Sequence, residues 1–322
     1  MPVLLISIQH EHLTSDRLEL LDKFRGDMTM LITQDKEKME QVIDDVEIAV
    51  GTVPPGLIEK AGKLKWFHQM GTGTEWLMRH PQARDQPFIL TNCSDDYGVV
   101  LAEHVMSLML AAARQLPEQF DSQSRGKWEQ APFSAANRFE LRGKTLLLLG
   151  VGSIGLNIAK RAKAFDMTIT GYRSDPSKCA ENVDKMYGPD ELHAAIAETD
   201  LIANSLPITD ETRRLIDAAA IGQMKETAWF FNIGRGTTVD EDALIDALQH
   251  KRIAGAGLDV FEKEPLPESS PLWQLPNVII TPHDGGNHNQ RYASWVSTCF
   301  DNLERYHTGK SLRNVVDKQA GY

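Results

Sequence analysis

The sequence predicts an α/β protein with two domains, each built on a doubly wound parallel sheet. Its 322 residues exceed the ~250 to 300 residues at which a single hydrophobic core usually stops growing. Short apolar runs rich in β-forming residues alternate with amphipathic stretches of helical period along most of the chain. This alternation is typical of βαβ units, in which helices join parallel strands.

The first part of the chain shows this alternation at short intervals. The segment 101–115 is apolar on almost every side and predicts a buried helix. Residues 116–143 are polar, with scattered aromatic side chains and little periodicity, and predict an extended arm or loop. We expect a helix at 15–24 and strands at 3–8, 28–32, 47–50, 64–70 and 88–91.

The second part of the chain predicts one larger doubly wound sheet, followed by a last helix at 290–306. We expect a substrate domain made of residues 1–98 and 288–322, and a dinucleotide-binding domain made of residues 99–287. The strands of the larger sheet are expected at 145–149, 167–172, 201–204, 228–232, 253–258 and 278–281.

Charge and composition exclude several classes of protein. Lys and Arg total 34 and Asp and Glu total 45, so the net charge is −11, whereas a nucleic-acid-binding protein needs a basic face to displace phosphate counterions. The chain starts without a basic segment or a small-residue cleavage site, and we see no stretch with the ~20 apolar residues that cross a bilayer. The three cysteines are widely spaced. We therefore expect a cytoplasmic protein without nucleic-acid or membrane partners.

Histidine patterns do not predict a metal site. His10, Glu11 and His12 stand together, and His288 follows His283 by five residues. Neither group has a third ligand at a spacing typical of metal sites. We expect no bound metal.

A glycine-rich turn follows the strand expected at 145–149. Gly150, Gly152 and Gly155 form a G-x-G-x-x-G pattern that continues into a helix. The first glycine allows a tight turn, the second lets backbone approach a pyrophosphate, and the third lets helix and strand pack closely. We expect this loop, with Ser153 and Ile154, to bind a dinucleotide, while a structural turn or an S-adenosylmethionine site stays open as an alternative.

The residue after the next strand predicts which dinucleotide binds. An acidic residue at this position binds the ribose 2′-hydroxyl in NAD-specific proteins, but here Arg173 and Ser174 follow the strand. A guanidinium and a hydroxyl suit a 2′-phosphate, so we expect NADP to be preferred and NAD to bind more weakly. A shift of two residues would instead place Asp175 at the ribose.

Polar side chains follow three later strands. Because the carboxyl ends of parallel strands line one crevice, these residues are expected to converge although they are far apart in sequence. Singly, each could be a turn, a cap, a solvated carboxylate or a packed imidazole. The residues are Arg235, Asp259, Glu264 and His283.

The segments that carry these residues resemble those of the D-2-hydroxyacid dehydrogenase family over nearly the full length of the chain. The resemblance implies two Rossmann-like or flavodoxin-like domains. It rests on the glycine loop and on SLPITDET at 205–212, NIGRGTTVDEDALIDAL at 232–248, LDVFEKEPLP at 258–267 and TPH at 281–283.

The resemblance also implies roles for the catalytic residues. Arg235 occupies the position of the substrate-binding arginine, Glu264 that of its acidic partner, and His283 that of the acid/base. Asp259 resembles the residue that meets the nicotinamide carboxamide. The chemistry agrees: an imidazolium held by a carboxylate can give a proton to the reduced carbonyl oxygen, and a guanidinium can hold the carboxylate of a 2-keto acid. The acidic Asp284 next to His283 departs from the family pattern.

Other family positions complete the expected site. Thr72 and Gly73 resemble the loop whose amides bind the substrate carboxylate, although an ordinary turn is the alternative. Pro207, Thr212 and Ile233 resemble positions beside the dinucleotide. The polar arm with Trp128, Phe133 and Phe139 lies where the family embraces a second subunit, so we expect a homodimer.

Together these observations predict an oxidoreductase that reduces a 2-keto acid to a D-2-hydroxy acid with NADPH, in a reversible reaction. Glyoxylate or hydroxypyruvate and larger 2-keto acids are equally open as substrates. The alternative is a dinucleotide-sensing binding protein of the same fold with little turnover, resembling the C-terminal binding proteins. The absence of an added interaction tail favours the enzyme.

Overall fold

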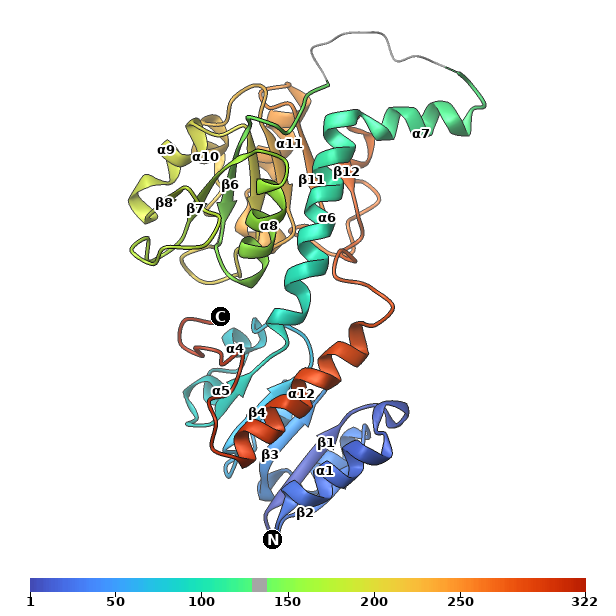
Figure 1. Cartoon of the computed structure of the whole chain (residues 1–322), viewed down its shortest axis with the longest axis vertical. Helices are drawn as coiled ribbons and strands as arrows, with labels where there is room; N and C mark the ends of the chain where they lie inside the picture. Colours follow the sequence, from blue (N-terminus) through green and yellow to red (C-terminus); the bar gives the residue numbers. More distant parts are fainter. Residues whose placement is uncertain (129–137) are drawn as a thin grey trace. The chain divides into compact units, whose positions relative to one another are not determined.

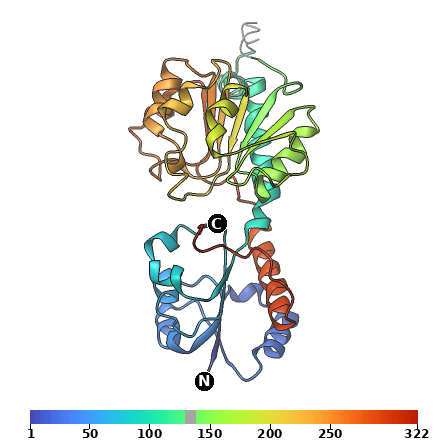
Figure 2. The same ribbon diagram turned by 90° about the vertical axis from the view of Figure 1, so that its left-hand side faces the viewer.

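The computed structural model describes residues 1–128 and 138–322 and divides the chain into two compact units. Met1–Tyr97 and His288–Tyr322 form the first unit, and Gly98–Asn287 forms the second. The sequence placed the second domain at 99–287, one residue later at its start. Each unit is an α/β layer structure with a parallel sheet between helices, which confirms the predicted fold class (Figures 1 and 2).

The first unit holds a five-stranded parallel sheet in the order β2-β1-β3-β4-β5, a flavodoxin-like order. Helices cover both of its faces, because α1 and α12 pack on one face while the short helices between the strands pack on the other (Figure 2). The strands are β1 (Val3–Ser7), β2 (Thr29–Ile32), β3 (Val46–Gly51), β4 (Trp66–Gln69) and β5 (Ile89–Thr91); the helices are α1 (Ser15–Arg25), α2 (Lys36–Glu40), α3 (Pro55–Ile58), α4 (Trp76–Arg79), α5 (Pro81–Asp85) and α12 (Arg291–His307).

The second unit holds a seven-stranded parallel sheet in the order β12-β11-β10-β9-β6-β7-β8. The order reverses at β6, so a crevice opens there at the carboxyl ends of the strands. The strands are β6 (Thr145–Leu149), β7 (Thr168–Tyr172), β8 (Lys185–Tyr187), β9 (Leu201–Asn204), β10 (Trp229–Asn232), β11 (Gly255–Leu258) and β12 (Val278–Ile280); the helices are α6 (Ser94–Arg114), whose first four residues belong to the first unit, α7 (Leu116–Ser124), α8 (Ser153–Lys163), α9 (Leu192–Ala197), α10 (Ala218–Gly222) and α11 (Glu241–Gln249).

The long helix α6 owes its apolar composition to core packing. By length and composition alone, it could cross a membrane, although no such stretch was expected from the sequence. In the structure its Val105 and Met109 are buried in the same hydrophobic core as Leu146 and Leu148 of β6. A buried helix of a globular core meets the same test of length and composition, so the apolar residues of α6 are explained by this packing.

Three expectations from the sequence were wrong in detail. The helix expected at 101–115 begins seven residues earlier, at Ser94. Part of the expected arm is the helix α7, which has a proline in its first turn. The residue before it, Gln115, adopts a left-handed conformation with φ 52°. The strand β8 was not expected, because it is a three-residue edge strand containing Lys185.

Of the aromatic side chains in the arm that the structure describes, one is packed, contrary to the expectation of exposed residues, and one is exposed as expected. Phe139 packs against the core of the second unit, and its N–H donates to the carbonyl of Ala113 at 3.2 Å. Trp128 is 94% exposed. Phe133 lies outside the described residues.

Candidate active site

The predicted dinucleotide loop connects β6 to α8 in a tight turn. Gly150 has φ 93°, which favours glycine, and its N–H donates to the carbonyl of Tyr172 at 3.0 Å. A Cβ on Gly155 would lie 2.3 Å from the carbonyl oxygen of Gly150, so any side chain there would force the turn apart. Gly152 precedes the first residue of α8, and a Cβ there would meet nothing within 4 Å. This open backbone at a helix N-terminus fits the pyrophosphate of a dinucleotide.

Two residues of this loop extend the turn into the helix. Ser153 is the first residue of α8, and Ile154 packs against the core formed by α6, α8 and the sheet. The apolar side chain of Ile154 therefore fixes the start of α8. The backbone amides of this first turn lie at the carboxyl end of β6, beside the glycine loop.

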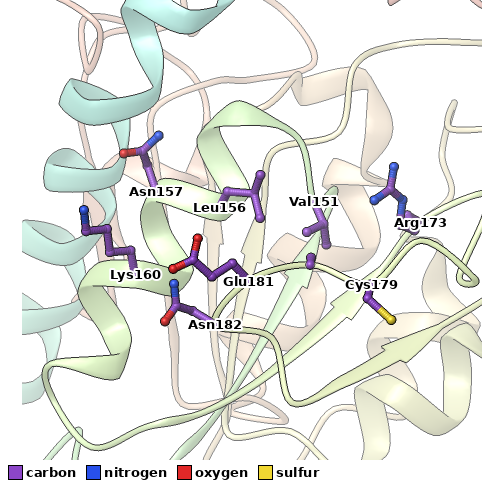
Figure 3. A pocket seen from close by; sticks show the side chains of 9 residues that line it. Val151, Leu156, Asn157, Lys160, Arg173, Cys179, Glu181 and Asn182 are labelled. Carbon is purple, nitrogen blue, oxygen red and sulfur yellow. The ribbon is translucent and has the colours of Figure 1, made fainter.

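A pocket of about 300 Å³ lies beside this loop (Figure 3). Arg173, the first residue after β7, lies on one side of it, and Lys160 of α8 lies on the other. The pocket, which also borders Val151 of the glycine loop, is therefore lined by these two cationic side chains and by one acidic side chain, Glu181. A phosphate group would be attracted to this side of the loop.

The carboxylate of Asp175 is engaged within its own turn. It accepts hydrogen bonds from the hydroxyl of Ser177 at 2.5 Å and from the N–H of Ser177 at 3.2 Å, and it pairs with Lys178 at 3.6 Å. The bond from the Ser177 hydroxyl is the largest cause that lowers the pKa of Asp175. Ser174 lies exposed between Arg173 and Asp175.

The loop after β9 is held by Thr212. Its hydroxyl donates to the carbonyl of Pro207 at 2.7 Å and accepts from the N–H of Thr209 at 2.8 Å. The expected dinucleotide residue Thr212 therefore shapes the loop on which Pro207 stands. Ile233, another expected contact, is 4% exposed, and its N–H donates to the carbonyl of Asn204 at 3.1 Å.

Buried polar side chains at the ends of β9 and β10 fix the turn that carries Arg235. The carbonyl of Arg235 accepts from the hydroxyl of Thr238 at 2.6 Å and from the amide of Asn232 at 3.3 Å. The side chain of Asn204 donates to both Asn232 at 3.0 Å and Thr238 at 2.8 Å. Buried amides and hydroxyls that bond one another in this way hold a rigid turn. The guanidinium of Arg235 also donates to the carbonyl of Gly234 at 2.7 Å.

The structure brings Glu264 and His283 together. Nδ1 of His283 lies 2.7 Å from Oε2 of Glu264, and Oε1 of the same carboxylate accepts from the N–H of Phe261 at 3.0 Å. An ionised carboxylate only accepts hydrogen bonds, so the ring donates from Nδ1. The side chain of His283 is 49% exposed, which leaves Nε2 as the ring nitrogen for an external group.

The Arg235 turn lies directly against the segment that leads to Glu264. A Cβ on Gly236 would lie 1.8 Å from the carbonyl carbon of Phe261, so the two backbones touch there. The ends of β10, β11 and β12 are neighbours in the sheet. The three expected catalytic side chains therefore come from adjacent turns at one edge of the second unit.

Asp259 lies deeper at this edge and is 2% exposed. Its carboxylate accepts from the hydroxyl of Thr281 at 2.6 Å, from the N–H of Asp284 at 3.1 Å and from the N–H of Gly285 at 3.2 Å. The side chain of Asp284 itself is exposed. The buried carboxylate thus binds the backbone segment on which His283 stands.

Thr72 and Gly73 belong to the first unit, in the loop between β4 and α4. The carbonyl of Thr72 accepts from the side chain of Asn92 at 3.1 Å, and that of Gly73 accepts from the side chain of Gln69 at 2.8 Å. Side chains on the neighbouring strand end and on the chain after β5 therefore hold the loop in shape.

Comparison with known proteins identifies the family. Residues 106–285 match the model of the "D-isomer specific 2-hydroxyacid dehydrogenase, NAD binding domain". The chain belongs to this family. A nicotinamide dinucleotide is accordingly the cofactor for which the second unit is built, in agreement with the open glycine loop.

Curated and solved members of the D-isomer specific 2-hydroxyacid dehydrogenase family match over most of the chain. D-3-phosphoglycerate dehydrogenase of Methanocaldococcus jannaschii is 35% identical over 95% of this chain, which spans 58% of that protein's length. Glyoxylate/hydroxypyruvate reductase B of Enterobacter sp. is 40% identical over 67% of each chain. The family member from Xanthobacter autotrophicus, solved in complex with NADPH and MES, has a TM-score of 0.79 and 29% identity, with 100% of both chains covered.

Sequence reasoning missed the residues that position these family side chains. Asn204 and Asn232 end their strands and Thr281 directly follows β12, so a polar residue at the end of an apolar run was the available signal for these three. Thr238 lies in the 3-10 helix Gly236–Thr238, where no such signal was present. The contact of His104 with Thr281 joins residues 177 positions apart. No spacing within the sequence indicates such a contact.

Proposed function

We propose that the protein reduces a small 2-keto acid to the D-2-hydroxy acid with NADPH, and that the reaction is reversible. The observation that carries this proposal is the 2.7 Å contact between Nδ1 of His283 and Glu264, on a ring that is half exposed at the dinucleotide-binding edge. The dinucleotide supplies the hydride when it is bound. The chain must then provide a proton and a site for the substrate carboxylate.

His283 is the residue suited to give the proton. Glu264 accepts from Nδ1 and fixes the orientation of the ring, so a proton on Nε2 can pass to the carbonyl oxygen of the substrate. In the reverse direction, Nε2 takes the proton from the hydroxyl group. Glu264 therefore acts by orienting the ring and by compensating its positive charge.

Arg235 is suited to hold the substrate. A guanidinium can bind a carboxylate through two parallel hydrogen bonds and polarise the neighbouring carbonyl. Its backbone is fixed by Asn232 and Thr238, which limits the entropy lost when substrate binds. Thr72 and Gly73 are our candidates for further contacts with the carboxylate.

We propose that NADP is preferred over NAD. Arg173 directly follows β7, where a residue meets the 2′ position of the adenosine ribose. Lys160 lines the same pocket and offsets the negative charge of Glu181, so the pocket keeps a net positive charge. Asp175, the competing acidic residue, is bound to Ser177 and Lys178. The solved relative from Xanthobacter autotrophicus also contains NADPH.

The initial rate of NADPH oxidation tests this function directly. We would assay glyoxylate, hydroxypyruvate, and branched and aromatic 2-keto acids with the wild type and with His283→Gln. We expect turnover with at least one substrate, a loss of about 100-fold or more in His283→Gln, typical of a missing acid/base, and NADPH binding within about threefold of wild type. Turnover unchanged by the substitution would contradict the role of His283. NADPH binding without any turnover would favour a dinucleotide-sensing protein.

We further propose that the protein acts as a homodimer in the cytoplasm. Phe120 on α7 is 60% exposed and Trp128 is 94% exposed. Apolar side chains that a second subunit covers in a dimer are exposed in this way when one subunit is considered alone. The three cysteines are free thiols, which suits a reducing compartment.

A further inference from the structure

His104 contacts the segment of His283 from a distant part of the sequence. It stands on α6, its side chain is 16% exposed, and its Nε2 lies 3.1 Å from the hydroxyl oxygen of Thr281. The Thr281 hydroxyl has one proton, and it donates that proton to Asp259 at 2.6 Å. His104 must therefore donate from Nε2 to Thr281. A directed chain of hydrogen bonds, which we call the relay, runs from His104 through Thr281 to Asp259.

The chain ends on a buried carboxylate that needs these donors. Burying an ionised carboxylate is unfavourable unless hydrogen bonds compensate its charge. Asp259 receives the Thr281 hydroxyl and the N–H groups of Asp284 and Gly285. Both ends of the segment from Thr281 to Gly285 are therefore attached to one carboxylate.

His283 lies between these two attachments in an uncommon conformation. Its φ is 52°, in the left-handed region that non-glycine residues adopt when their surroundings hold them there. The segment also packs directly on the relay, because a Cβ on Gly285 would lie 2.6 Å from Cδ2 of His104 and 2.9 Å from Oδ2 of Asp259. The contacts of this segment with His104 and Asp259 thus fix the backbone conformation that orients the His283 ring toward Glu264.

We propose that His104 is a positioning residue for His283, acting through Thr281 and Asp259. The role rests on the proposed function, in which the Nε2 atom of His283 meets the substrate. It is separate from the contact with the nicotinamide carboxamide that family resemblance implies for Asp259. His104 touches neither Glu264 nor His283 in the contacts described, so its effect passes through the backbone from Thr281 to Gly285.

The relay predicts a loss of turnover without a loss of dinucleotide binding. A misplacement of about 1 Å in a catalytic group can lower a rate by about 100-fold. Removing a donor at His104 or Thr281 leaves the Gly150–Gly155 loop and Arg173 unchanged. We expect kcat to fall while the Kd for NADPH stays close to that of the wild type.

Two matched pairs of variants in the full-length protein test the relay. Thr281→Val removes the hydroxyl and keeps the shape, whereas Thr281→Ser restores the hydroxyl. His104→Leu removes the donor, whereas His104→Gln can place an amide N–H near the position of Nε2. We would measure kcat, KM for the keto acid, Kd for NADPH and the thermal unfolding midpoint of each variant.

We expect Thr281→Val and His104→Leu to lower kcat about tenfold or more, with the KM and Kd values within threefold and the conservative partner in each pair within threefold of wild-type kcat. Turnover by the wild type together with wild-type kcat in Thr281→Val and His104→Leu would overturn the relay but not the proposed function. Equal losses of kcat within each pair, in proportion to a lower unfolding midpoint, would also overturn it. No turnover by the wild type would refute the proposed function itself, and the relay would then lack its reaction.

Discussion

At the scale of single residues, Arg173 is the side chain to which we assign the proposed preference for NADP. We expect Arg173→Asp to weaken NADPH binding by about 10- to 100-fold, because a charge-assisted hydrogen bond of ~1.5 to 3 kcal/mol is lost and a like charge is introduced. NADH should bind within about threefold of its wild-type affinity, since an aspartate can accept from the 2′-hydroxyl. Fluorescence titration with both dinucleotides measures the two effects.

The control for this substitution is Lys178→Ala. Lys178 is a nearby cation that is paired with Asp175, and it does not line the pocket beside Arg173. Lys178→Ala should leave the ratio of the NADPH and NADH affinities unchanged. Equal losses for NADPH and NADH in Arg173→Asp would place the 2′-phosphate elsewhere.

Residues of the candidate site differ in how far the sequence predicts their environment. The pairing of Glu264 with His283 was expected from motifs at the ends of consecutive strands, and the two side chains lie 2.7 Å apart. The burial of Asp259 and its bonds to Thr281 and Gly285 were not expected. A motif preserves the identity of a residue, but the hydrogen-bond partners of a buried carboxylate depend on how a loop folds back.

At the scale of elements, Asp200 ties the start of β6 to the segment before β10. Its carboxylate accepts from the N–H of Thr145 at 2.9 Å and from Nζ of Lys225 at 3.0 Å. Burial favours the protonated form, but the bonds to Thr145 and Lys225 outweigh it, so the pKa of Asp200 is lowered. Because the folded-state pKa is below the unfolded value of ~3.9, this carboxylate stabilises the fold above pH ~4 and loses its effect in more acidic solution.

We expect Asp200→Asn to lower the free energy of unfolding by about 1 to 2 kcal/mol at pH 7, since an ionised acceptor is replaced by a neutral one. Urea unfolding at pH 7, 5 and 3 should show the same difference at pH 7 and 5 and a smaller one at pH 3. Glu226→Gln, an exposed carboxylate beside Lys225, should change stability by less than about 0.5 kcal/mol. A difference that persists undiminished at pH 3 would contradict the role of the charge.

Elements were predicted best where they are buried. The strands β6 and β9 have the bounds expected from the sequence, since both are continuous apolar runs in the middle of the sheet. The edge strand β8 and the helix α7 were missed. The helix α7 buries none of its side chains, and β8 has only three residues, so neither hydrophobic period marks them. Backbone pairing in β8 and a proline at the start of α7 decide their conformation.

At the scale of the whole molecule, the fold class follows from two features of the chain. Apolar runs without alternation predict strands buried on both faces, and helical stretches between them require parallel crossovers. The sheet orders β2-β1-β3-β4-β5 and β12-β11-β10-β9-β6-β7-β8 both arise from such crossovers. The sequence also indicates that the chain leaves the first unit and returns to it, because the final helix follows the last strand of the second sheet.

At this scale, the exposed aromatic side chains support the expectation of a dimer. Phe120 on α7 is 60% exposed, and an aromatic side chain left in water loses the free energy that burial would supply. We expect sedimentation equilibrium to give about twice the chain mass of 36.0 kDa for the wild type, and Phe120→Glu to shift the distribution toward the monomer, because a carboxylate in an apolar interface must be desolvated. Met78→Glu, at a side chain that is 41% exposed in the first unit, is the matched control and should remain dimeric. A monomeric wild type at micromolar concentration would refute the dimer, and a dimeric Phe120→Glu variant would show that α7 does not form the interface.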